Sequence, residues 1–96
     1  MSLEAILRVV DKSLLELKML LRDKQVTLAI DDGARKWLAD HGYDEKMGAR
    51  PIARLVHDKI KRPLANELLF GKLADGGHVK ITLRDDELVL RLNADK

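Results

Sequence analysis

The sequence predicts a single α+β domain in which a three-stranded sheet packs against helices. Apolar residues recur at helical spacing through much of the chain, and three short runs have the composition or alternation of strands, at residues 26–30, 79–83 and 88–92. A chain of 96 residues can bury one modest hydrophobic core. The predicted order is helix, strand, helix, bent helix, strand, strand, with the helices on one face of the sheet.

The composition excludes several classes of protein. The chain is 46% apolar and 35% charged, as expected of a soluble globular domain, and its net charge of +2 gives little drive toward nucleic acid or membrane. No cysteine is present, which excludes disulfides and thiolate metal sites and is compatible with a cytoplasmic location. The three histidines, at positions 41, 57 and 78, are too scattered to predict a metal site.

The ends of the chain show no targeting segment. There is no basic region followed by an apolar stretch at the start, so no signal peptide is expected, and no apolar run is long enough to span a bilayer. Residues 1–3 fit a cloning remnant, residues 4–93 are expected to form the single domain, and residues 94–96 read as a polar tail.

The first predicted helix covers residues 4–23. Its stripe of apolar residues has steps of four and three, which is typical of a core-facing helix: Leu3, Leu7, Val10, Leu14, Leu17 and Leu21. Five further apolar residues make the stripe wider than one core needs: Ile6, Val9, Leu15, Met19 and Leu20. This excess indicates that part of the helix packs on something outside the chain. A β-rich strand follows at residues 26–30.

The second predicted helix covers residues 32–41. Asp31 and Asp32 are good N-cap residues, and Trp37 and Leu38 are expected to face inward. Gly42 is expected to end the helix in the left-handed conformation.

A third predicted helix runs from Arg50 to about residue 61. Its core stripe is expected to include the aliphatic stem of Lys59 and four apolar residues, Ile52, Leu55, Val56 and Ile60. Pro63 lacks an N–H and should bend or restart the helix, which then continues to residue 70 and stops at Gly71.

The C-terminal third predicts a hairpin with one buried face. After a turn at residues 76–77, apolar and polar residues alternate along both strands, and the chain reverses at Asp85 and Asp86.

Arg50 stands in an unusual position. Pro51 is well suited to the first position of a helix, which places Arg50 at the helix N-terminus. A cation there opposes the helix dipole by up to about 1 kcal/mol, whereas the unpaired N–H groups of that end attract anions. An exposed Arg bridging to a nearby carboxylate is one interpretation. An anion from outside the chain is the other.

Two other functions, DNA binding and assembly, compete with the binding of an outside anion at Arg50. The element order nearly matches a winged-helix DNA-binding domain, but the hairpin tip, Asp85-Asp86-Glu87, would repel phosphates, and Asp58 interrupts the basic helix. A helical assembly module that uses the first helix is a third interpretation.

A family resemblance favours the interpretation that Arg50 meets an anion from outside the chain. The stretch Tyr43-Asp44-x-x-Met47-Gly48-Ala49-Arg50-Pro51 resembles the sensor-2 motif of the Clp/Hsp100 family of AAA+ unfoldases. The similarity extends to residues 9–12, 34–39 and 63–71, and so covers nearly the whole chain. Within that family, the matching part is the C-terminal small, or lid, subdomain of the second ATPase module.

The resemblance implies a role for each motif residue. Arg50 would contact the phosphates of ATP or ADP, while Gly48 and Ala49 would let the nucleotide approach closely. Tyr43, Asp44 and Pro51 would support the motif, and no residue of this chain would be catalytic by itself. The implied partners are the large AAA+ subdomain of the same chain, neighbouring subunits of a homohexamer, a ClpP-like protease ring and protein substrates, with no nucleic acid and no membrane. No Walker A or B motif is present, so the chain alone is expected to be inactive.

Overall fold

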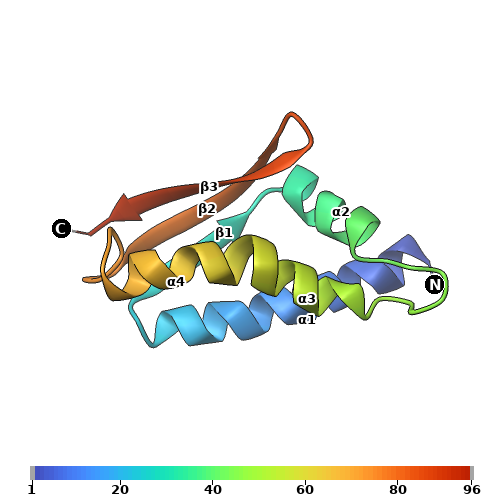
Figure 1. The fold of residues 1–96 in the computed structure, drawn as a ribbon, viewed down its shortest axis with the longest axis horizontal. Helices are drawn as coiled ribbons and strands as arrows, with labels where there is room; N and C mark the ends of the chain where they lie inside the picture. Colours follow the sequence, from blue (N-terminus) through green and yellow to red (C-terminus); the bar gives the residue numbers. More distant parts are fainter. Residues whose placement is uncertain (1, 96) are drawn as a thin grey trace.

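A computed structural model describes residues 2–95. Helices and strands follow the predicted order, and three helical segments are joined end to end after Arg50 (Figure 1). The elements are α1 (Leu3–Arg22), β1 (Val26–Ile30), α2 (Asp32–His41), α3 (Pro51–Val56), the π-helical segment η1 (His57–Lys61), α4 (Arg62–Leu69), β2 (Gly77–Arg84) and β3 (Glu87–Ala94).

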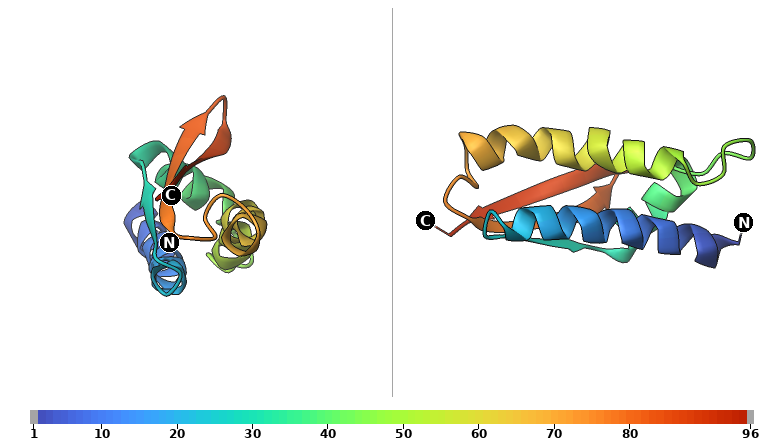
Figure 2. Two further views of the ribbon diagram at one scale, coloured as in Figure 1. Left: turned by 90° about the vertical axis from the view of Figure 1, so that its left-hand side faces the viewer. Right: turned by 90° about the horizontal axis from the view of Figure 1, so that it is seen from below.

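The sheet is mixed, with β2 in the middle. Strand β1 runs parallel to β2, and β3 runs antiparallel to β2. The hairpin turns at Asp85 and Asp86, whose φ values of 53° and 61° are those of a two-residue turn that fits the strand twist. Helices cover one face of the sheet and leave the other open (Figures 1 and 2). The predicted α+β fold is confirmed.

The core lies between the sheet and the long helices. It is built from every second residue of β1 and β2 and from one stripe of each helix. In α1 the buried residues are Ile6, Val10, Leu14, Leu17 and Leu21. Leu3, predicted to begin this stripe, is 49% exposed, and the first buried residue of the helix is Ile6. Lys59 is also exposed, so the prediction that its stem joins the core is wrong.

Several large apolar side chains remain at the surface. Leu15, Met19 and Leu20 of α1 are each more than half exposed, as the excess width of the stripe predicted. Phe70, which directly follows α4, is 85% exposed. Trp37 is half-buried, and its indole Nε1–H donates to the carbonyl of Asp86 at 3.0 Å, which ties α2 to the hairpin turn.

The prediction for Gly42 is wrong in its backbone conformation. Its φ of −98° and ψ of 7° are not left-handed. Glycine is required there for space, because a Cβ atom would overlap the side chain of Ile52 and lie 2.7 Å from the Leu38 carbonyl oxygen. The close approach of α2 to α3 explains the residue.

Pro63 does not interrupt the helical segment that begins at Pro51, but it is preceded by an irregular turn. The helix continues through it, and the turn before it, η1, is a π-helix. The N–H of Arg62 donates to the carbonyl of His57, five residues back, instead of four. A wider turn of this kind accommodates the missing N–H of proline.

Candidate functional site

The Tyr43–Gly48 segment folds into a closed loop. The backbone N–H of Asp44 donates to the Gly48 carbonyl at 2.8 Å, and the N–H of Gly48 donates back to the Asp44 carbonyl at 2.6 Å. The Asp44 carboxylate also accepts from the N–H groups of Lys46 and Met47, at 2.7 and 3.3 Å. Gly48 has a φ of +69°, a conformation that glycine adopts without strain. These bonds fix the loop and thereby the position of the residues after it.

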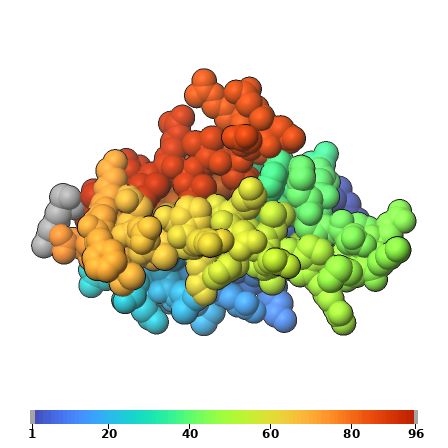
Figure 3. All heavy atoms as spheres, in the orientation of Figure 1, coloured from blue at the N-terminus to red at the C-terminus, as the bar shows by residue number. Residues whose placement is uncertain are grey.

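Arg50 is the N-cap residue of α3 and Pro51 is the first helical residue, as predicted. The Arg50 side chain is exposed and makes no capping hydrogen bond. Among residues 2–95, its guanidinium forms no hydrogen bond or ion pair with the protein. Its charge therefore faces solvent at the start of α3. The loop that leads from α2 into α3 lies at one end of the molecule (green, at the right of Figure 3).

The other motif residues flank Arg50 differently. Ala49 and Tyr43 are half-buried and pack against the core, so they anchor the two ends of the loop. A Cβ atom on Gly48 would meet no atom within 4 Å, which leaves open space beside that residue. Arg54, one turn after Arg50, lies 3.8 Å from Asp58 and is thus partly neutralised. Arg50, by contrast, has no carboxylate partner among residues 2–95.

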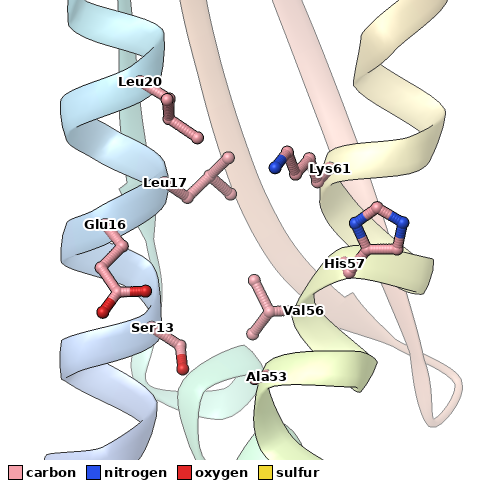
Figure 4. A pocket seen from close by; sticks show the side chains of 8 residues that line it. All are labelled: Ser13, Glu16, Leu17, Leu20, Ala53, Val56, His57 and Lys61. Atoms are coloured by element: carbon pink, nitrogen blue, oxygen red, sulfur yellow. The ribbon is translucent and has the colours of Figure 1, made fainter.

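A hollow that was not predicted from the sequence lies between α1 and the continuous helical segment α3–η1 (Figure 4). It has a volume of about 250 Å³ and an apolar floor, with Glu16 on one wall and Lys61 on the other. Lys61 extends toward Leu17 and Leu20. Its lining residues come from two segments far apart in the sequence, residues 13–20 and 53–61, so sequence patterns alone could not locate it. None of the motif residues lines this hollow, so it is separate from the Arg50 site.

An ion pair joins two segments that carry the family resemblance. The Arg35 guanidinium donates two hydrogen bonds of 2.7 Å to the Asp11 carboxylate, which ties α2 to α1. The hydrogen bonds from Arg35 lower the pKa of Asp11 below its usual value. The same contact raises the pKa of Arg35, which keeps its charge. This pair was not predicted, because 24 residues separate its partners in the sequence.

Among residues 2–95, no group of three or more histidine, aspartate or glutamate side chains is arranged so that it could hold a metal ion. In the same part of the chain, no helix has the length and apolar character needed to cross a membrane.

The chain belongs to the Clp/Hsp100 family of AAA+ chaperones. Residues 1–81 match the family described as the C-terminal, D2-small domain of ClpB protein. The match spans all of the helices and most of β2, so the fold described above is that of the small subdomain of the second ATPase module.

Individual relatives agree with this assignment. The chain is 49% identical to a ClpA homolog protein of Fuscovulum blasticum over 93% of its length. It is 43% identical to the chaperone protein ClpB of Brucella suis over 86%, and 40% identical to that of Lactiplantibacillus plantarum over 93%. It spans about a tenth of the length of each, 11%, 10% and 10%. Most of the length of each relative therefore lies outside the region that matches this chain. The winged-helix interpretation gains no support from any of these matches.

Proposed function

We propose that this chain is the sensor-2 lid of a ClpA-like, ATP-dependent protein unfoldase. The observation that carries the proposal is the exposed, unpaired Arg50 guanidinium, held at the N-terminus of α3 by a hydrogen-bonded loop. A guanidinium stays charged at every physiological pH and binds phosphate oxygens with a planar fork. The phosphates would come from ATP or ADP bound to the large subdomain.

The closed loop explains how Arg50 could report on the nucleotide. Because Asp44 and Gly48 fix the loop, and Ala49 packs on the core, the position of Arg50 is coupled to the whole subdomain. Loss of the γ-phosphate would remove part of the attraction on Arg50. The lid would then turn as a rigid body against the large subdomain, a ligand-dependent domain closure.

The assembly around the lid is part of the same proposal. In a cytoplasmic homohexamer, each lid would also contact the neighbouring subunit, and the exposed apolar residues of α1, Leu15, Met19 and Leu20, are suited to such a contact. A ClpP-like protease ring would receive the unfolded substrates. The choice of ClpA over ClpB is supported by the higher identity to the ClpA homolog protein, 49% against 43% and 40% for the two ClpB chaperones.

Substitution of Arg50 in the full-length parent protein tests the role. Arg50→Ala should lower the rate of ATP hydrolysis by at least about tenfold, because a preorganised cation at the phosphates is lost. Unfolding of a tagged substrate protein should fall with it. The free energy of unfolding of the 96-residue chain should change by less than about 0.5 kcal/mol, since Arg50 is exposed and unpaired.

Arg54→Ala is the matched control, because Arg54 is another exposed arginine one turn further along the same rod. It should leave ATP hydrolysis near the wild-type rate. Wild-type hydrolysis in the Arg50→Ala protein would refute the sensor-2 assignment.

A further inference from the structure

Strand β1 forms an open edge of the sheet. The strand order is β1-β2-β3, so β1 has a neighbour on one side only. Figure 2 shows β1 at the margin of the molecule, alongside α1. An open edge carries unpaired N–H and C=O groups that can bind another extended chain.

Hydrogen bonds at the two ends of β1 show which backbone groups face outward. The Gln25 carbonyl accepts from Gly77, and the Asp31 N–H donates to Ile81, so odd-numbered residues face β2. In a parallel pair, successive residues point their backbone groups to opposite sides. The N–H and C=O groups of Val26, Leu28 and Ile30 therefore point to the open edge. Their side chains are buried or half-buried, so these residues offer backbone groups alone.

A hollow with a volume of about 310 Å³ lies along this edge. Val26, Thr27 and Leu28 form its strand side, and Lys18 and Arg22 of α1 form its helix side. The two cations are four residues apart on the helix, a spacing at which like charges repel. Neither forms an ion pair with any of the residues 2–95.

We propose that the β1 edge binds an extended, acidic peptide segment of a partner protein as a fourth strand. Backbone hydrogen bonds would come from the outward-facing groups of β1, and carboxylates at alternate positions would meet Lys18 and Arg22. A second copy of β1 is a poorer occupant, because two-fold pairing would bring the same cations together. The proposal is independent of the role of Arg50.

The test uses the 96-residue chain and a fluorescein-labelled synthetic peptide. The peptide has about six residues, a common strand length, with Glu alternating with Thr. Fluorescence anisotropy should show saturable binding, and the same peptide with Lys in place of Glu should not bind. Lys18→Gln and Arg22→Gln should each weaken binding by up to about fivefold, and Lys12→Gln, on another face of α1, should not.

Two further measurements separate strand addition from charge attraction alone. Peptides N-methylated at one alternate set of amides should lose binding, and those methylated at the other set should keep it. Amide hydrogen exchange at Val26, Leu28 and Ile30 should slow when the peptide is added. The proposal is overturned by no saturable binding, by equal effects of the two methylated sets, or by protection of these amides through dimerisation of the chain without peptide.

Discussion

At the scale of single residues, glycines and aspartates position the motif. Asp44 satisfies two backbone N–H groups of its own loop, and Gly48 supplies the positive φ that closes it. Gly42 provides the space in which α3 approaches α2. These contacts fix the loop that precedes α3, and Arg50 at the start of α3 is exposed to solvent.

Replacement of Gly42 tests the packing argument. Gly42→Ala should lower the free energy of unfolding by about 1–3 kcal/mol, because the added methyl overlaps Ile52 and the Leu38 carbonyl. Urea denaturation of the purified chain measures this change.

Gly33→Ala is the matched control. Its Cβ would meet its nearest neighbours, Asp31 and Leu83, at an ordinary 3.6 Å within a helix, so the variant should gain up to about 1 kcal/mol. Equal stabilities of the two variants would show that close packing at Gly42 is not the cause of its glycine.

Some features of single residues could be predicted from the sequence and others could not. The cap at Asp31, the N1 proline and the position of Arg50 were predicted, since each depends on a few adjacent residues. The reason for a glycine at position 42 was not, because it depends on the nearby side chain of Ile52, ten positions away in a different helix. Sensing of a nucleotide by Arg50 stays a prediction.

At the scale of elements, α1 and α2 are joined by an ion pair that makes stability depend on pH. The pKa of Asp11 is lowered in the folded chain by its hydrogen bonds from Arg35. A lowered folded pKa stabilises the fold above the unfolded value of about 3.9, and this contribution is lost as pH falls through the folded pKa.

Asp11→Asn should therefore cost less than about 1 kcal/mol at neutral pH, because both side chains are partly exposed and screened by solvent. The difference between wild type and variant should shrink toward zero in acid below the folded pKa. Urea denaturation at several pH values measures it. A pH-independent difference would mean that packing, and not charge, connects the helices. Arg35→Gln, alone and combined with Asp11→Asn, gives the double-mutant cycle that measures the interaction energy of the pair.

The helical rod after Arg50 shows a second element-scale effect. Proline chemistry predicted an interruption near residue 63, but not its form. Over His57–Lys61 the helix takes about one more residue per turn than an α-helix, and it then continues as α4. Ile60 and Leu64, on either side of this change, are both fully buried against the core. Tertiary packing thus decided between a break and a bulge.

At the scale of the whole molecule, the chain holds one half of a proposed nucleotide site. The helix order, the strands and the hairpin turn followed from local periodicity and turn chemistry. The hollow between α1 and the α3–η1 segment did not, since its two walls come from residues 13–20 and 53–61, which are distant in sequence.

The half-site predicts that the isolated chain has no measurable affinity for ATP. A single exposed guanidinium competes with water and salt for phosphate, and Arg50 lines none of the main hollows found among residues 2–95. Isothermal titration calorimetry measures this. A dissociation constant in the micromolar range would contradict it and would require a phosphate site within this subdomain.

The parallel pairing of β1 with β2 has a consequence for how the chain folds. Thr27 and His78, bonded side by side on the two strands, are 51 residues apart, and α2, α3, η1 and α4 lie between them. The β2–β3 hairpin closes a two-residue turn and can form locally within microseconds. The β1–β2 contact must wait for a large loop to close, and the entropy of that closure is recovered only as the intervening helices pack. The central strand thus acquires its two neighbours at different times, and docking of β1 is expected to be the late, rate-limiting event in forming the sheet.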